Sequence, residues 1–376
     1  MIPELNPRQR AWVEVSTAAI RANARALCAH LTSGTELMAV VKADGYGHGA
    51  ETVARAALQG GATSLGVATL QEGLELRRAG LEAPVLLLSN LNQPDDLRTC
   101  LHWRLMPTLS SLRDAQLCNA LAADSGRRFD VQLKIDTGMA RLGCSLNDSH
   151  QTATGLQALA HLNLVGIYSH LACADEPNDH LTSLQQERFS SMLSSVPQSG
   201  DSLCRHLANS AGTLLNRELH HDLVRVGLAL YGHAPAHHLS DVIPLQPALA
   251  LRARVSLIRE VPAGTGVSYG HRFITERPSR LAVVGIGYAD GVLRSLSGHI
   301  QAMHLNRLLP QVGAITMDQL LLDATDAPEL EVGNIVTLLG RDGDLELSPQ
   351  SWSEQCGSIP WEILCGFKRR LPRVEV

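Results

Sequence analysis

The sequence predicts an α/β protein built from an N-terminal (β/α)8 barrel and a C-terminal mainly-β domain. From about residue 37 to 232, eight short β-rich apolar runs alternate with helical patterns. Strict alternation is typical of parallel β/α units, and eight such units close a barrel. After about residue 245, apolar runs are separated by turns rich in Gly, Pro and Asp, with little helical periodicity.

The expected barrel strands lie in eight runs, in chain order LMAVVKA, SLGVATL, PVLLLSN, LMPTLSS, FDVQLKIDTG, LNLVGIYSHL, SLCRHLANSA and DLVRVGLALYG. Stretches such as AETVARAALQG and LQEGLELRRAG supply the helices between them. A doubly wound open sheet is the alternative, but no G-x-G-x-x-G motif follows the first strand. The expected domains are 1–245 and 246–376, and the strand-like run at 11–16 is expected to pair with the second domain.

Composition excludes several classes of function. The 376-residue chain is 45% hydrophobic and carries a net charge of −5, which argues against a nucleic-acid partner. No apolar run approaches the roughly 20 residues that span a bilayer, so no membrane partner is expected. The polar start MIPELNPRQRAW has no secretory h-region, and the eight cysteines form no C-x-x-C pair. Both observations favour a reducing cytoplasm.

The first expected strand ends on a lysine, in AVVKADGYGHGA. Such a lysine is either a solvent-reaching surface residue or a reactive amine. Only three of the 32 Lys and Arg residues are lysines, namely Lys42, Lys134 and Lys368. In a chain that otherwise uses arginine, the lysines are candidates for chemistry that needs a primary amine.

Polar residues cluster where the expected barrel strands end, which is where barrel enzymes place their active sites. They are Lys42, Lys134, Asp136, Arg141, His170, Asn209, Ser210 and Arg225, and Gly227 lies with Arg225 in the eighth strand. A lysine in such a place can carry pyridoxal 5'-phosphate (PLP), which acidifies a carbon next to nitrogen. Phosphate donors are available from Ser210, Tyr46 and the backbone at Gly227 and Leu228. Tyr46 could equally be a rim aromatic, and Ser210 could cap the following helix.

The motifs AVVKADGYGHGA, KIDTGMARLG, YSHLACADE, HLANSAG, VRVGLALYG, GVSYGHRF, IGYADG and TMDQ together resemble the alanine racemase family, in the family's order. The resemblance runs from about residue 11 to the C-terminus. It implies a β/α barrel, a C-terminal β domain, PLP as cofactor and a homodimer with shared active sites.

The resemblance also implies roles for individual residues. Lys42 would be the PLP lysine and the base for one face of the substrate, and Tyr269 of the partner subunit the base for the other face. Arg225 would face the pyridine nitrogen, with His170 behind it. The remaining expected PLP contacts are Tyr46, Asn209, Ser210, Gly227, Leu228 and Trp361.

Substrate binding is expected at Arg141, Met317 and Asp318, and Lys134 resembles a lysine that many members carry as a carbamate. Two positions depart from the family: Thr316 replaces a common cysteine, and Trp361 replaces a tyrosine that reaches the phosphate. The histidines of HAPAHH (233–238), in the expected interdomain loop, and of HHD (220–222) are expected to be solvated. Cys204 and His206 lack further ligands at zinc spacing, so no metal is expected.

The expected function is interconversion of L- and D-alanine, supplying D-alanine for peptidoglycan. A serine or broad-specificity racemase on the same scaffold remains an alternative. A PLP carrier without turnover is a second alternative, but carriers of this kind are single barrels. A PLP decarboxylase of the same barrel class would need a glycine-rich phosphate loop, which the sequence lacks.

Overall fold

The computed structural model describes residues 6–196 and 203–376 and divides into two compact units. The first unit comprises residues 18–45 and 50–246. The second comprises residues 6–17, 46–49 and 247–376. In the described residues, no helix is both long and apolar enough to cross a membrane.

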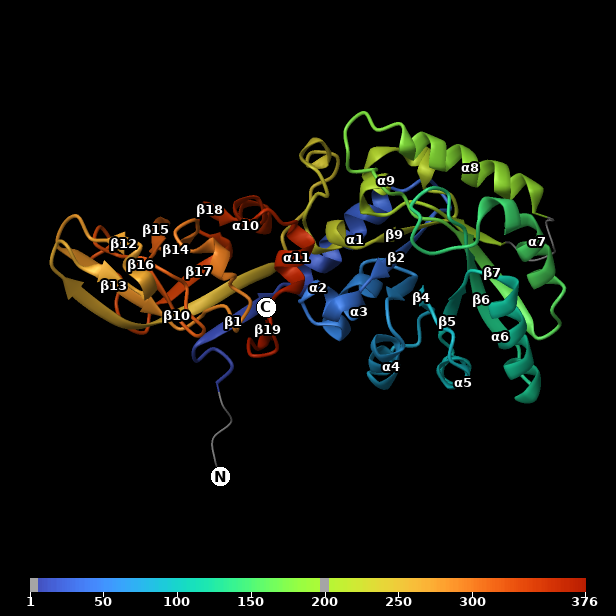
Figure 1. The fold of residues 1–376 in the computed structure, drawn as a ribbon, viewed down its shortest axis with the longest axis horizontal. Helices are drawn as coiled ribbons and strands as arrows, with labels where there is room; N and C mark the ends of the chain where they lie inside the picture. The colour runs from blue at the N-terminus through green and yellow to red at the C-terminus, as the bar shows by residue number, and fades with distance from the viewer. Residues whose placement is uncertain (1–5, 197–202) are drawn as a thin grey trace, which may run out of the picture. The chain divides into compact units, whose positions relative to one another are not determined.

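The first unit is a parallel eight-stranded barrel, which confirms the predicted fold (Figure 1). Its strands pair with their neighbours in chain order from β2 to β8, and β9 returns to pair with β2. Between β8 and β9, the Asp222 N–H donates to the Arg205 carbonyl and the Arg225 N–H to the Ala208 carbonyl, each at 3.0 Å. The strands are β2 (Glu36–Val40), β3 (Ser64–Val67), β4 (Val85–Asn90), β5 (Met106–Leu109), β6 (Phe129–Lys134), β7 (Leu162–Tyr168), β8 (Cys204–His206) and β9 (Leu223–Val226).

Helices follow the strands and surround the barrel. Side-chain caps define several of their starts, because a hydroxyl oxygen can accept an N–H that has no partner within the helix. Thr69 forms a capping box with Glu72, and Ser111 and Ser145 cap the two helices that precede and follow β6. The helices are α1 (Thr17–His30), α3 (Ala50–Gln59), α4 (Leu70–Arg78), α5 (Pro94–His102), α6 (Leu112–Asp124), α7 (Leu146–Gln157), α8 (Leu181–Ser195) and α9 (Ser210–Leu215).

The barrel interior is packed, not hollow. Met38, Leu86, Tyr168 and Leu223 come from four different strands and form one buried apolar cluster. The Tyr168 hydroxyl, buried with this cluster, lies 2.7 Å from the Thr108 hydroxyl, and Thr108 in turn donates to the Leu87 carbonyl at 2.6 Å. The Tyr168 hydroxyl, the one polar side-chain group of this cluster, therefore has a hydrogen-bond partner, as burial requires.

The second unit is built on a nine-stranded sheet with the order β18-β17-β14-β15-β16-β13-β10-β1-β19, and β10 also pairs with β17. The N-terminal strand β1 runs antiparallel to β10 and parallel to β19. Two short helices, α10 (Pro349–Cys356) and α11 (Pro360–Cys365), were not expected from the sequence. The strands are β1 (Ala11–Val15), β10 (Leu249–Val261), β13 (Ser279–Val284), β14 (Gln301–His304), β15 (Arg307–Val312), β16 (Leu320–Asp323), β17 (Ile335–Asp342), β18 (Leu345–Leu347) and β19 (Arg373–Glu375).

Candidate active site

Lys42 lies just beyond the carboxyl end of β2, at the start of a left-handed turn. This turn, α2 (Lys42–Tyr46), has φ values of +52° at Ala43, +53° at Asp44 and +60° at Gly45. Tyr46 and Gly47 continue it with φ values of +51° and +79°. Non-glycine residues in this region cost roughly 1–2 kcal/mol each. Such a run persists only where surrounding contacts hold it, and strained backbone of this kind clusters at functional sites.

Side chains from neighbouring segments hold the turn. The Ala43 N–H donates to Glu72 Oε1 at 2.7 Å, while Glu72 Oε2 accepts from the N–H groups of Ala68 and Thr69. Asp44 Oδ1 accepts the Ala50 N–H at 3.1 Å at the start of α3. The turn after Lys42 is therefore fixed by carboxylates, one of them on α4. Glu72 is not predicted from the sequence, because its partner Ala43 is 29 residues away.

The end of the same motif belongs to the second unit. A Cβ on Gly47 would overlap the Leu364 carbonyl of α11, so only glycine fits there. Tyr46 is buried, and burial raises the pKa of its phenol above the ordinary value. Its hydroxyl therefore keeps its proton near neutral pH.

Arg225 of β9 is the centre of a buried polar network in the barrel. Its Nη1 donates to His206 Nδ1 at 2.9 Å. Its Nη2 donates to the Ser169 carbonyl at 2.6 Å and lies 3.0 Å from His170 Nδ1. Burial lowers the pKa of Arg225 to about 10, which still leaves the guanidinium charged at neutral pH.

The network fixes both histidines in the neutral form. Burial, and then the charge of Arg225, lower the pKa of His170 and of His206 well below the ordinary value. Because an arginine can only donate, each Nδ1 accepts and the remaining proton sits on Nε2. His206 Nε2 then donates to Gln132 Oε1 at 2.7 Å. Sequence reasoning placed His170 here but missed His206 and Gln132. The only available signal was a polar residue in each of two expected strands.

Lys134, the last residue of β6, is buried near the positive charges of Arg225, Arg141 and Lys42. Burial lowers the pKa of its amine to about 8, with further lowering by Arg225, Arg141 and Lys42. Its Nζ lies 5.4 Å from the centre of the Tyr168 ring, and Arg225 Cζ lies 5.0 Å from the same ring centre. The structure thus brings Lys42, Lys134, Arg141 and Arg225 into one electropositive barrel mouth, as expected from the strand ends.

The loop after Lys134 is held by its own side chains. Asp136 Oδ1 accepts the N–H groups of Gly138, Met139 and Ala140 at 2.9–3.1 Å. Gln185 of α8 is fully buried and donates to the Thr137 hydroxyl and to the His170 carbonyl. Asp136 therefore shapes the loop that presents Arg141, and Gln185, which the sequence analysis missed, ties that loop to His170.

Ser210 and the start of the segment after β9 form a second polar cluster. The Gly227 N–H donates to Ser210 Oγ at 3.1 Å, and the Ala229 N–H lies 3.4 Å from the same oxygen. The helix-cap alternative for Ser210 is wrong, because Asn209 caps α9 by accepting the Gly212 N–H. Ser210 and these backbone donors match the chemistry that binds a phosphate.

The other expected site residues, Tyr269, Met317, Asp318 and Trp361, lie in the second unit. Tyr269 lies between the paired strands β11 (Gly266–Val267) and β12 (Phe273–Ile274). Its side chain is 73% exposed. Met317 and Asp318 are exposed on the turn between β15 and β16, and Trp361 is half-buried on α11.

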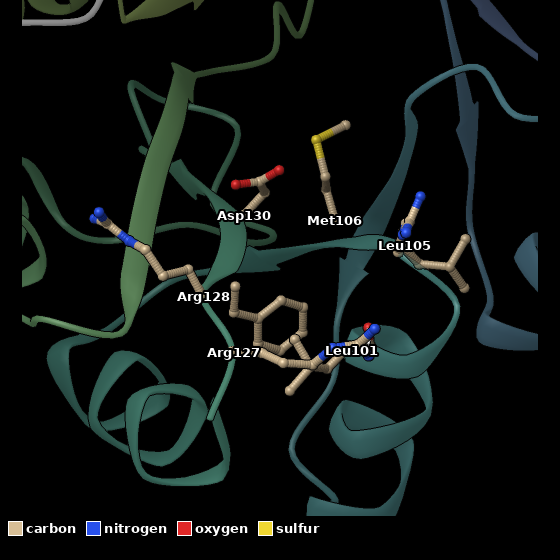
Figure 2. A pocket seen from close by; sticks show the side chains of 8 residues that line it. Leu101, Leu105, Met106, Arg127, Arg128 and Asp130 are labelled. Carbon is tan, nitrogen blue, oxygen red and sulfur yellow. Dashed lines mark hydrogen bonds between the residues drawn. The ribbon is translucent and has the colours of Figure 1, made fainter. Parts of the chain in front are cut away.

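The barrel also has a cavity of about 390 Å³ where β5 and β6 begin, opposite the strand ends that carry Lys134 (Figure 2). Arg127 and Arg128, which line it, donate to the carbonyls of Leu101 and Leu162. Its remaining lining is Leu101, Arg104, Leu105, Met106, Phe129 and Asp130. The N-terminal face of a barrel serves stability, so the candidate site is the mouth around Lys42. In the described residues, no His, Cys, Asp or Glu side chains group as metal ligands.

Comparisons with known proteins agree with this geometry. The alanine racemase N-terminal domain matches residues 15–235, and the C-terminal domain of the same family matches residues 248–375. An alanine racemase of Prochlorococcus marinus is 59% identical, over 99% of this chain and 98% of that protein.

Solved structures of alanine racemases have the same fold. The enzyme from D-cycloserine-producing Streptomyces lavendulae has a TM-score of 0.92 and 38% identity, over 99% of this chain and 98% of that one. The Bartonella henselae enzyme, described with covalently bound pyridoxal phosphate, has a TM-score of 0.88 and 31% identity, over 98% and 99%. Matches over both units, at this identity, show that the chain belongs to the alanine racemase family.

Proposed function

We propose that this protein is a PLP-dependent racemase that interconverts L- and D-alanine. The observation that carries the proposal is a barrel mouth with Lys42 just beyond the end of β2 and a buried Arg225 on the neighbouring strand β9, in a chain matched over 99% of its length by an alanine racemase. The C-terminal unit, which carries Tyr269, argues against a PLP carrier made of one barrel.

The barrel residues fit PLP chemically. Lys42 supplies an amine for the aldehyde. The Ser210 hydroxyl, which accepts the Gly227 N–H and can itself donate, supplies phosphate donors together with the Leu228 N–H. Arg225 cannot accept a proton from the ring nitrogen, and its charge disfavours protonation there. The expected remaining contacts are Tyr46, His170, Asn209 and Trp361. When bound, PLP withdraws electrons from the substrate and acidifies its Cα–H bond.

Inversion at Cα requires two bases on opposite faces. Lys42 Nζ takes or returns the proton on one face, and Tyr269 Oη of the partner subunit does so on the other. Free lysine amines and tyrosine phenols titrate near 10, so side chains of these two types need neighbouring positive charge to act as bases near neutral pH. Arg141 supplies such a charge and binds the substrate carboxylate, while Met317 and Asp318 line the entrance.

We further propose a homodimer in the cytoplasm, supplying D-alanine for peptidoglycan. The 73% exposure of Tyr269 in the single chain supports its donation to a partner site. All eight cysteines are free thiols, which supports a reducing compartment.

The test is formation of D-alanine from L-alanine by the purified holoenzyme, with serine and arginine as competing substrates. Alanine should be turned over with the largest kcat/KM. Borohydride reduction should fix the cofactor on Lys42, and the matched variants are Lys42→Ala, expected to be inactive, and Lys368→Ala, expected to be active. A larger kcat/KM for serine would favour the broad-specificity alternative. Bound PLP without turnover of any amino acid would favour the carrier.

A further inference from the structure

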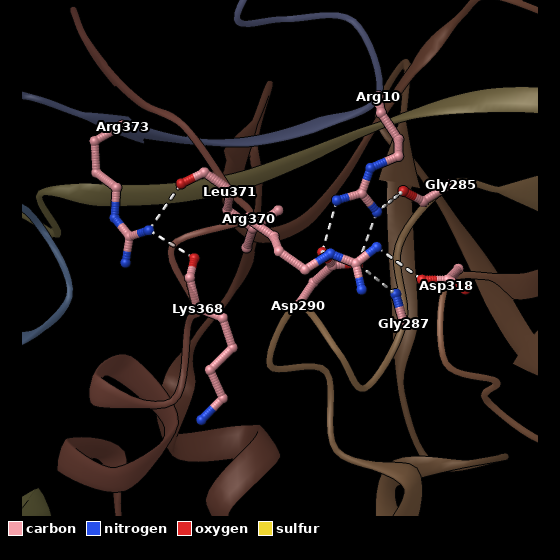
Figure 3. A network of polar contacts seen from close by, with 9 residues as sticks. All are labelled: Arg10, Gly285, Gly287, Asp290, Asp318, Lys368, Arg370, Leu371 and Arg373. Atoms are coloured by element: carbon pink, nitrogen blue, oxygen red, sulfur yellow. Dashed lines mark hydrogen bonds and ion pairs between the residues drawn. The ribbon is translucent and has the colours of Figure 1, made fainter.

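The turn that carries Met317 and Asp318 is held against an ion-pair network in the second unit that is centred on one buried carboxylate (Figure 3). At its centre, the Asp290 carboxylate is fully buried. Arg10 donates to both of its oxygens, at 2.6 and 2.7 Å, and the Gly287 N–H donates to Oδ2 at 3.0 Å. A two-pronged arginine pair with an added backbone donor satisfies this carboxylate.

Arg370 approaches the same carboxylate but binds another one more closely. Its Nε lies 3.5 Å from Asp290 Oδ1, whereas its Nη2 donates to Asp318 Oδ1 at 2.7 Å. Because Arg10 and Gly287 already satisfy Asp290, the shorter contact of Arg370 is directed to Asp318. The two arginines and two aspartates together carry no net charge.

The backbone on both sides of this contact is fixed. The Lys368 N–H donates to the Asp290 carbonyl at 3.0 Å, and Arg373 Nη1 donates to the carbonyls of Lys368 and Leu371 at 2.8 Å. This sets the turn from which Arg370 projects.

On the other side, the N–H groups of Tyr288 and Ala289 donate to the carbonyls of Thr316 and Met317, each at 3.0 Å. A Cβ on Gly287 would overlap both of those carbonyl oxygens, so only glycine allows this approach. The backbone of the turn is thus anchored without Arg370. Arg370 instead fixes the carboxylate of Asp318, whose side chain is 56% exposed.

We propose that Arg370 is a positioning residue of the substrate entrance, which holds and neutralises the Asp318 carboxylate. This inference rests on the proposed function, in which Asp318 lines the entrance. The substrate brings a carboxylate of its own, and an Asp318 released from Arg370 would repel it. Loss of Arg370 should therefore weaken substrate capture and leave the chemical step intact.

The experiment measures kcat and KM for L-alanine in the wild-type holoenzyme, Arg370→Gln, Asp318→Asn and the double variant. A partly exposed ion pair supports an effect of up to about fivefold. Arg370→Gln should raise KM about two- to fivefold and change kcat by less than about twofold. The KM difference should shrink at about 0.5 M salt, where repulsion is screened. In the Asp318→Asn background, Arg370→Gln should have no further effect.

Two further variants separate this role from general stability. Arg341→Gln removes an exposed pair with the same 2.7 Å distance, to Glu346, and should leave both constants unchanged. Arg370→Lys keeps the charge and should recover most of the wild-type KM. Two results overturn this inference alone, provided that the wild type is active. One is an unchanged KM in Arg370→Gln. The other is a KM increase of equal size when Arg370→Gln is added to Asp318→Asn. A wild type that makes no D-alanine refutes the proposed function as well.

Discussion

At the scale of single residues, burial and the charge of Arg225 together set the protonation of the side chains around it. Burial, and then the charge of the Arg225 guanidinium in contact with them, lower the pKa of His170 and of His206 and keep both imidazoles neutral. Burial, and then the same charge, lower the pKa of Lys134 to about 8. A site with so many cations needs an anion, and PLP phosphate or a modified lysine would provide one.

We predict that Lys134 carries a carbamate. Carbon dioxide reacts with the neutral amine, and a pKa of about 8 leaves a much larger neutral fraction at pH 7 than an ordinary lysine has. The resulting anion would pair with Arg141, which an ammonium repels. Lys134→Ala should lose about tenfold or more of kcat/KM, the value of roughly one charge-assisted bond. Acetate or chloride should partly restore it.

The carbamate also has a direct signature. Wild-type protein should show a mass increase at Lys134 under native conditions, and acidification should remove it, because protonation of the amine reverses the reaction. An unmodified ammonium in a fully active enzyme would contradict the prediction.

A second prediction at this scale concerns Trp361. If its indole N–H replaces the family's tyrosine hydroxyl on the PLP phosphate, removing it costs about 1.5–3 kcal/mol. That corresponds to a PLP dissociation constant that is about tenfold to hundredfold larger in Trp361→Phe. Trp361→Tyr should largely preserve affinity. Equal affinity in all three proteins would leave Trp361 as a packing residue.

At the scale of elements, the left-handed turn after β2 determines where Lys42 lies. Its residues adopt unfavourable φ values that Glu72 and Asp44 compensate through backbone N–H groups. Glu72 belongs to α4, and it also completes the capping box of that helix. One carboxylate thus couples the start of a helix to the position of Lys42.

We predict that Glu72→Gln weakens this coupling. A carboxylate that accepts three N–H groups is replaced by an amide that presents its own N–H to one of them, at a cost of about 1–3 kcal/mol in the free energy of unfolding. PLP affinity, measured by fluorescence titration of the apoenzyme, should fall together with the free energy of unfolding. The control is Glu75→Gln on the same helix, whose carboxylate accepts only from the exposed Gln71 side chain in the described residues. Equal PLP affinity in both variants would show that the turn holds without Glu72.

Elements of this kind mark the limit of what the sequence predicts. The eight barrel strands and α3 and α4 follow from apolar runs and helical periodicity, which are local signals. Glu72 and Gln185 lack such a signal, because their partners lie in other segments of the chain. The helices α10 and α11 were also missed: each is short, and each starts at a proline that reads equally well as a turn.

At the scale of the whole molecule, the two expected bases belong to different units. Lys42 lies in the barrel, whereas Tyr269 lies on an exposed segment of the second unit. An aromatic side chain that is 73% exposed gains little within its own chain, but a symmetric partner could bury it. Proposed sharing of the site across a dimer gives this exposure a function.

The last prediction tests that sharing. Lys42→Ala and Tyr269→Phe homodimers should each be nearly inactive, because each lacks one base at both sites. When the two variants are unfolded, mixed in equal amounts and refolded, random assembly makes half of the dimers heterodimers. If each site takes Lys42 from one subunit and Tyr269 from the other, every heterodimer has one site with both bases intact. About a quarter of the wild-type D-alanine formation should therefore return. Without any return, and with heterodimers verified by native mass spectrometry, both bases must come from the same chain.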